Sequence, residues 1–198
     1  LEVEILSLTR PVKDLSLIKK ISDHLKETNL RNYMLFRFHF YTALRTQDVL
    51  RLKVKDVRGK YQIAYEYEIT VQEKKTKKTK FLNINPELQR DIEEYTENMN
   101  DDDYLFPSQK RNPDGSQRPL TREQAFRILK KAGEEVGVKI SGHALRKTAC
   151  YHMYKKGIPI AVISQMLNHS SERVTRRYIG LEQEDIKQAY YSLSLDEL

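Results

Sequence analysis

Residues 141–157 read SGHALRKTACYHMYKKG, and this stretch predicts one complete helix. Ser141 is a residue type that caps helix N-termini, and Gly157 is a residue type that commonly ends a helix. His143 and Arg146 are three residues apart, so their side chains share a face of that helix. The stretch therefore predicts a helix that presents a histidine and an arginine side by side.

Helical patterns continue on both sides of this stretch. Downstream, Pro159 begins another helix, and residues 182–191 form a last one. Upstream, apolar residues recur at threes and fours from Asp14, and Asn29 caps a very apolar helix over residues 33–44, which should be buried on most sides. Further helices are predicted over residues 46–52, capped by Thr46, over 86–98, and over 121–136, opened by a Thr121–Gln124 capping box.

One segment has the period of a strand instead. Apolar and polar residues alternate over residues 65–72, and residues 81–84 form the return strand after a run of lysines over 74–80. An acidic turn follows at 100–103, and a long basic loop at 107–119. The predicted fold class is α+β, mainly α, with one small antiparallel sheet near the middle of the chain.

Composition sets wide limits on function. The net charge of +7 suits a polyanionic partner but also an ordinary soluble protein. Cys150 is the single cysteine, which excludes an intramolecular disulfide, and no Cys/His cluster has zinc spacing. No apolar stretch approaches the ~20 residues of a membrane span, and no secretory signal opens the sequence. An intracellular protein is the simplest interpretation.

Six polar residues have the chemistry needed to cut a phosphodiester without a metal. They are Arg45, Lys75, His143, Arg146, His169 and Tyr178. A planar guanidinium matches the two non-bridging oxygens with parallel hydrogen bonds. Histidine and lysine can move protons, and a phenol can attack if a cationic pocket favours its phenolate. The set predicts DNA-strand exchange with Tyr178 as the nucleophile.

Each of these residues taken alone has an ordinary structural explanation. An isolated arginine usually lies on a solvated face, a lone histidine is more often structural, and Tyr178 is one of twelve tyrosines. The lysine run is typical of a solvated hairpin tip. Such a tip can also touch DNA phosphates, and one of its lysines can protonate the leaving sugar oxygen. Only the combination favours a catalytic site.

In sequence order, the motifs resemble those of the tyrosine recombinase (phage integrase) family, over nearly the whole chain. The matching boxes are residues 42–52 (TALRTQDVLRL), 75–76 (KT), 143–146 (HALR), 166–171 (MLNHSS) and 175–178 (TRRY). Ala43 and Asn168 stand where the family usually has glycine; asparagine tolerates a positive φ, and alanine suits a helix end. Lys147 stands where many members have histidine, and by its spacing it should point away from the His143–Arg146 face.

The resemblance implies a catalytic domain over residues 14–181. Residues 1–13 would be a lead-in, and residues 182–198 a C-terminal helix and tail that either passes to a neighbouring protomer or packs on its own domain. The implied protein is a site-specific DNA recombinase or integrase of a mobile element. It would cut and rejoin strands through a 3′-phosphotyrosyl link on Tyr178, with no metal or cofactor.

The resemblance also implies a role for each catalytic residue. Arg45 and Arg146 would stabilise the transition state, His143 and His169 would assist, and Lys75 would protonate the leaving oxygen. Expected contacts to DNA are made by Lys74, Lys77, Lys78, Lys80, Lys147 and Arg176.

The implied partner is double-stranded DNA at a recombination site. The protein would be a homotetramer on DNA and a monomer when free, in the bacterial cytoplasm or nucleoid and away from membranes. Family members carry an N-terminal core-binding domain, and this sequence opens at Leu1 rather than at Met. We therefore expect a fragment whose DNA binding is weak and strongly salt-dependent.

Three alternatives use the same residues or the same fold. A type IB topoisomerase would relax supercoils as a monomer, and a telomere resolvase would form hairpin ends. A DNA-binding relative that has lost catalysis would form no covalent complex.

Overall fold

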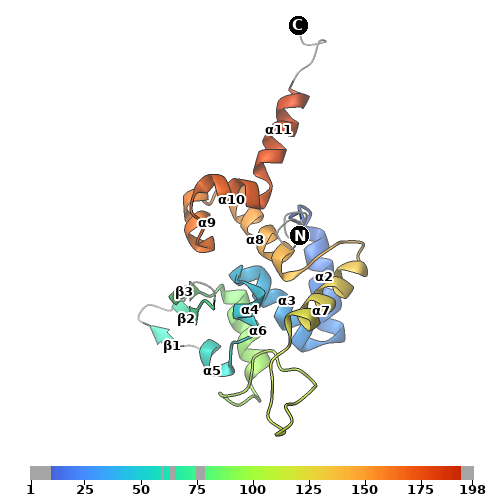
Figure 1. The fold of residues 1–198 in the computed structure, drawn as a ribbon, viewed down its shortest axis with the longest axis vertical. Helices are drawn as coiled ribbons and strands as arrows, with labels where there is room; N and C mark the ends of the chain where they lie inside the picture. Colours follow the sequence, from blue (N-terminus) through green and yellow to red (C-terminus); the bar gives the residue numbers. More distant parts are fainter. Residues whose placement is uncertain (1–9, 59, 63–65, 75–78, 193–198) are drawn as a thin grey trace.

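The computed structural model describes residues 10–58, 60–62, 66–74 and 79–192. The chain forms a mainly helical domain with one small antiparallel sheet (Figure 1), which confirms the predicted fold class. The helices are α2 (Leu15–Thr28), α3 (Leu30–Thr42), α4 (Thr46–Val49), α5 (Val54–Val57), α6 (Pro86–Thr96), α7 (Arg122–Glu134), α8 (Gly142–Lys155), α9 (Ile160–Leu167), α10 (Glu172–Ile179) and α11 (Leu181–Tyr191). The strands are β1 (Lys60–Gln62), β2 (Glu66–Gln72) and β3 (Thr79–Asn83).

Helix starts follow the capping residues that the sequence predicts. The Asn29 side chain accepts a hydrogen bond from the Asn32 amide at the start of α3, and Ser141 accepts one from the Ala144 amide at the start of α8. The capping box of Thr121 and Gln124 is also present. The prediction that Thr46 caps the next helix was wrong, because Arg45 is the N-cap residue of the four-residue α4.

The sheet has the order β1-β2-β3 and is antiparallel throughout. The register of β2 and β3 runs from Glu68 opposite Asn83 to Gln72 opposite Thr79. Ile69 and Val71 face the core, each 3% exposed, as their alternation predicts. The sequence pattern missed β1 and α5, because segments of three and four residues are too short to show a period.

Helix α3 lies at the centre of the domain. One set of its side chains packs in a core with the sheet and α6, and another packs in a core with α2 and α7. Phe36 and Phe38, from opposite sets, are both essentially unexposed. The expectation that this helix is buried on most sides is confirmed. Its C-terminal end therefore has a fixed position from which to hold a site.

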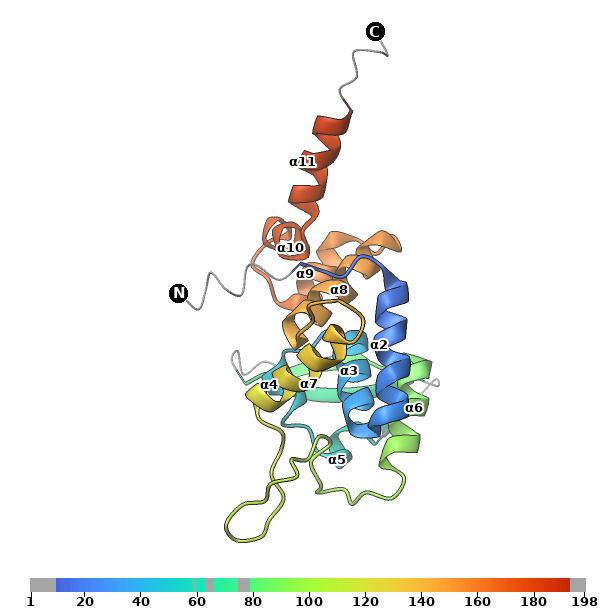
Figure 2. The same cartoon turned by 90° about the vertical axis from the view of Figure 1, so that its right-hand side faces the viewer.

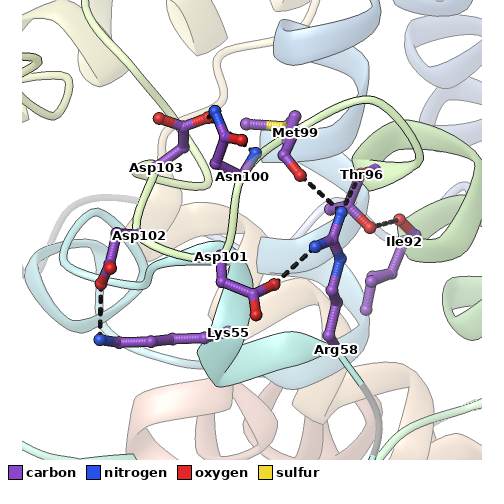
Figure 3. Close-up of polar contacts among 9 residues, drawn as sticks. All are labelled: Lys55, Arg58, Ile92, Thr96, Met99, Asn100, Asp101, Asp102 and Asp103. Carbon is purple, nitrogen blue, oxygen red and sulfur yellow. Dashed lines mark hydrogen bonds and ion pairs between the residues drawn. The ribbon is translucent and has the colours of Figure 1, made fainter.

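The acidic turn at residues 100–103 ties α5 to the end of α6 (Figure 3). Arg58 Nη2 donates to the carbonyls of Thr96 and Met99, both at 2.6 Å, and Arg58 Nη1 lies 2.5 Å from Asp101 Oδ1. Lys55 Nζ is 2.6 Å from Asp102. Exposed ion pairs of this kind contribute little each, but the carbonyl contacts fix where α6 ends relative to α5.

Helices α8, α9 and α10 form a separate core cluster, and α11 extends away from the rest of the domain in both views (Figures 1 and 2). On α11, Ile186, Tyr190 and Tyr191 are 58%, 74% and 75% exposed. Within the described ranges, no helix has the length and apolar content needed to cross a lipid bilayer.

Candidate active site

A cavity of about 460 Å³ lies where four parts of the fold meet. They are the α3–α4 junction, the N-terminal ends of α7 and α8, and α10 with the turn before it, of which the turn contributes His169 and the C-terminal end of α10 contributes Tyr178. The cavity is lined by Leu44, Arg45, Thr46, Gln47, Arg122, Gly142, His143, Arg146, His169 and Tyr178. Five of the six predicted catalytic residues are therefore brought to one cavity. The sixth, Lys75, lies outside the described residues.

A buried carboxylate holds the side chain of Arg45, the N-cap residue of α4. Its Nη1 donates to Glu73 Oε1 at 2.7 Å, and Glu73 is 0% exposed. The Arg45 side chain is 27% exposed, and it lines the cavity. A guanidinium has five N–H donors, so an ion pair made through Nη1 is compatible with a phosphate bound at the others.

Arg146 is buried, at 4% exposure, and is fixed by two backbone carbonyls. Its Nη1 donates to the Ala43 carbonyl and its Nη2 to the Leu167 carbonyl at 3.2 Å. Burial lowers the pKa of Arg146, and the electrostatic interaction with Tyr178 offsets part of that shift. Ala43 has φ 49° at the C-cap of α3, a left-handed conformation that costs a non-glycine residue roughly 1–2 kcal/mol. That conformation ends α3 and supplies the carbonyl that Arg146 binds.

Tyr178 lies between the two predicted histidines. Its Oη is 3.3 Å from His143 Nδ1, and its ring meets the rings of His143 and His169 edge-on, with centroids 5.1 and 5.0 Å away. His169 is oriented by Thr175, whose Oγ1 lies 3.0 Å from His169 Nδ1. Burial raises the pKa of the Tyr178 phenol to about 12, and Arg146 and Arg45 oppose that rise. The phenol is therefore neutral at pH 7 and needs an acceptor for its proton.

The expectation that Lys147 points away from this group was wrong. Lys147 is 5% exposed, and its Nζ lies 5.1 Å from the centroid of the Tyr178 ring. Burial lowers its pKa. Lys147 lies about 100° around the helix from Arg146 but only about 40° from His143, because it follows His143 by four residues. It therefore shares the side of α8 that faces Tyr178. Lys147 thus packs beside the predicted nucleophile, with little surface left for solvent.

Comparison with known sequences identifies the family of this chain. The sequence model of the phage integrase family matches residues 13–185. The chain belongs to the phage integrase family. All of the motifs, from residue 42 to residue 178, lie within this range, so the resemblance that they show is confirmed.

Curated members of the phage integrase family differ in how much of their length this chain spans. The probable integrase/recombinase YoeC of Bacillus subtilis is 38% identical over 184 residues, which are 92% of this chain and 96% of YoeC. The tyrosine recombinase XerA of Pyrococcus furiosus is 27% identical over 181 residues, but these make up only 60% of XerA. The chain thus spans nearly all of one relative and about three fifths of the other.

Solved structures share the fold of this family member. The crystal structure of XerA recombinase superposes with a TM-score of 0.69 at 22% identity, covering 92% of this chain and 63% of that one. The XerH site-specific recombinase, solved in a post-cleavage complex with its difH substrate, gives a TM-score of 0.67 at 20% identity, covering 92% of this chain and 53% of that one.

The residues predicted to contact DNA differ in their exposure and in how much of each the structure describes. Lys74 is exposed, and its backbone amide donates to Asp48 Oδ1 at 2.9 Å, which anchors the start of the lysine run beside α4. Arg176 is partly exposed, and its Nη2 is 2.6 Å from Asp185 of α11. Lys77 and Lys78 lie outside the described residues, and for Lys80 only the backbone, in β3, is described.

Sequence reasoning missed Glu73 and the side chain of Asn168. Asn168 has φ 54° at the C-cap of α9, as its residue type permits, and its Nδ2 donates to Glu73 Oε2 at 3.1 Å. A signal for Glu73 was present, because it continues the core-facing alternation of Ile69 and Val71. A carboxylate at such a position is buried at a cost and needs partners.

His39 lies behind the site and gives the fold a pH dependence. It is fully buried in α3, and burial lowers its pKa to about 4 from an ordinary 6.5. The unfolded chain therefore takes up a proton near pH 6.5, whereas the folded chain resists until about pH 4, so stability is lost as the pH falls through this window. At pH 5 the shifted pKa of His39 lowers the free energy of unfolding by roughly 2 kcal/mol.

We expect His39→Gln to reduce the loss of stability between pH 7 and pH 5 by roughly 2 kcal/mol. Urea unfolding at the two pH values measures it. His24→Gln, at a partly exposed position on α2, is the matched control and should keep the wild-type pH dependence. An unchanged loss in His39→Gln would show that His39 is not the acid-sensitive group.

Gly142 allows α8 to approach α4 closely. A Cβ at this position would lie 2.3 Å from Thr46 Oγ1 and 3.1 Å from His39 Cε1. We expect Gly142→Ala to push the start of α8, and with it His143, away from the cavity. Alanine favours a helix by about 1 kcal/mol, but the overlap should cost about 1–3 kcal/mol and slow catalysis at least ~10-fold.

The rate of DNA cleavage by Gly142→Ala, alone and combined with Thr46→Ala, measures this effect. Removing the Thr46 hydroxyl should restore part of the rate, because it removes the shortest overlap. Full activity of the single variant would mean that α8 has room that the structure does not give it.

Proposed function

We propose that this chain is the catalytic domain of a site-specific DNA recombinase, an integrase of a mobile element. It cuts and rejoins DNA through a 3′-phosphotyrosyl intermediate on Tyr178. The observation that carries the proposal is the convergence of Arg45, His143, Arg146 and His169 on the cavity that also holds Tyr178. Guanidiniums and imidazoles are what a transferring phosphoryl group requires for charge stabilisation and proton transfer.

In the first step a bond forms between Tyr178 Oη and the scissile phosphorus, and the bond from phosphorus to the 5′ oxygen breaks. His143 Nδ1, 3.3 Å from Oη, is placed to accept the phenolic proton. Arg45 and Arg146 bind the non-bridging oxygens as charge builds on them. Lys75 gives a proton to the departing 5′ oxygen, a role assigned from its motif.

In the second step the 5′-hydroxyl of a partner strand attacks the phosphotyrosine, and Tyr178 leaves as a phenol. One phosphodiester replaces another, so the exchange needs no net input of energy from nucleotide hydrolysis. The buried environment of Tyr178, which raises its pKa to about 12, makes the phenol a competent leaving group only when its proton is returned.

Double-stranded DNA is the proposed substrate and partner, supported by solved family members in DNA complexes, XerH with difH among them. A homotetramer on DNA, with a free monomer, is the proposed assembly. The projecting α11, with Ile186, Tyr190 and Tyr191 exposed, supports its exchange between protomers. We propose residues 14–181 as the catalytic unit and 182–198 as the exchanged segment.

Covalent trapping tests the proposed reaction and needs no defined target sequence. The probe is a pool of nicked duplexes with one randomised arm, in which the short strand beyond the cleavage point dissociates and cannot be rejoined. Wild-type protein should form an adduct that survives detergent, and sequencing of the adduct should reveal a preferred arm.

Two results would contradict the proposal. Absence of any adduct from the pool would indicate a DNA-binding relative without catalysis. Adducts with no sequence preference, together with relaxation of supercoiled plasmid by the monomer, would indicate a topoisomerase instead.

A further inference from the structure

Glu73 is a buried carboxylate that joins two parts of the site. It directly follows β2, is 0% exposed, and is not among the residues that line the cavity. Its Oε1 accepts from Arg45 Nη1 at 2.7 Å, and its Oε2 accepts from Asn168 Nδ2 at 3.1 Å. The two partners lie 123 residues apart in sequence (168 − 45), and each belongs to a catalytic box.

Burial makes both contacts strong and makes their loss costly. An ionised carboxylate taken out of water must be paired and hydrogen-bonded, and its removal leaves the partner groups without that compensation. The two hydrogen bonds also fix the orientation of the groups that donate them. One holds the guanidinium of Arg45 on a fixed side, and the other holds the left-handed residue that directly precedes His169.

A second anchor fixes the backbone on which Glu73 stands. The amide of Lys74 donates to Asp48 Oδ1 at 2.9 Å, and Asp48 lies in α4, three residues after Arg45. The end of β2 is therefore attached to α4 twice, by a backbone contact and by an ion pair. The lysine run begins at this point of attachment.

We propose that Glu73 is a positioning residue for the strand-transfer reaction, the common partner that sets the Arg45 guanidinium and the Asn168–His169 turn in one mutual arrangement. This inference rests on the proposed function of the site. Glu73 itself does not touch the phosphate, because an ionised carboxylate has no proton to donate and would repel the phosphate oxygens. It acts through Arg45 and Asn168.

The test compares three single variants in single-turnover cleavage of the trapping substrate. Glu73→Ala should cleave roughly 10- to 100-fold more slowly, the scale of a misplaced catalytic group. DNA affinity should stay the same or increase, because a negative charge is lost beside the phosphate site. Glu73→Gln keeps the size and one acceptor oxygen for Arg45, and its Nε2 can donate to Asn168 Oδ1 once the Asn168 amide turns over, so it should recover most of the rate. Asp91→Asn neutralises a largely buried carboxylate outside the cavity, which has a side chain 12% exposed and pairs with Arg37 at 2.7 Å, and it should cleave like wild type.

A double-mutant cycle with Asn168→Gly separates positioning from general destabilisation. Glycine keeps the left-handed backbone but has no amide to bind Glu73. If Glu73 acts partly through Asn168, the double variant should be less impaired than the product of the two single effects. The proposal is overturned if Glu73→Ala cleaves at the wild-type rate, if Asp91→Asn is equally slow, or if the two effects multiply fully.

These outcomes can be told apart from failure of the proposed function. If wild-type protein forms the adduct and Glu73→Ala forms it equally fast, the recombinase assignment stands and only the role of Glu73 is lost. If wild-type protein forms no adduct at all, both fall together.

Discussion

Tyr178→Phe is expected to form no covalent adduct with DNA, while binding it as wild type does. The substitution removes one oxygen, the atom 3.3 Å from His143 Nδ1, and leaves a ring of the same shape between His143 and His169. No bond from the ring to phosphorus is then possible. The loss should therefore be complete, whereas losses from the surrounding residues should be partial.

Gel analysis of the trapping reaction under denaturing conditions gives the measurement, and a mobility shift without detergent reports binding. Tyr190→Phe is the matched control, because Tyr190 lies on α11 and is 74% exposed. It should trap DNA as efficiently as wild type. If Tyr178→Phe still formed the adduct, another residue would have to be the nucleophile.

Arg146→Lys is expected to slow cleavage by roughly 10²- to 10³-fold, the usual effect of removing one preorganised donor from a transition state. Lysine keeps the positive charge that offsets part of the rise in the pKa of Tyr178 caused by burial. It lacks the planar fork needed to bind a phosphate while also satisfying the carbonyls of Ala43 and Leu167. The deficit should therefore appear in the rate and not in the pH at which the phenol ionises.

Arg146→Ala should be worse, because it also removes that charge, so the pKa of Tyr178 rises further. The carbonyls left without a donor should lower stability by about 1–3 kcal/mol, which a thermal melt detects. Arg37→Lys serves as the control, since Arg37 is half-buried in an ion pair with Asp91 outside the cavity. Cleavage by Arg146→Lys within about threefold of wild type would mean that the guanidinium does not bind the reacting phosphate.

The helices were predictable because their signals are local. Asn29, Ser141 and the Thr121–Gln124 box act within one turn of the residues they cap, so the sequence alone identifies them. The same reasoning failed for Thr46. Arg45 occupies that cap without a side-chain hydrogen bond, because a guanidinium has no acceptor for a backbone N–H, and it donates to Glu73.

The site was predictable in its residue types but not in its geometry. Motif order identified five residues that the fold brings to one cavity. The spacing of Lys147, four residues after His143, was enough to place it on the His143 side of the helix. The motifs could not show that it contacts the Tyr178 ring, because that contact depends on how α10 packs against α8. Nor could they show that Ala43 takes a left-handed conformation, which arises because the chain must turn sharply between α3 and α4 and direct a carbonyl at Arg146.

Mapping the DNA attachment point tests the central claim most directly. Trypsin cleaves after Arg177 and Lys187, so Tyr178 falls in the peptide YIGLEQEDIK, in which it is the single hydroxyl-bearing residue. After nuclease treatment of the trapped adduct, mass spectrometry should find the nucleotide remnant on this peptide, joined through a 3′ phosphate. A remnant on any other peptide, or a 5′ linkage, would contradict the account.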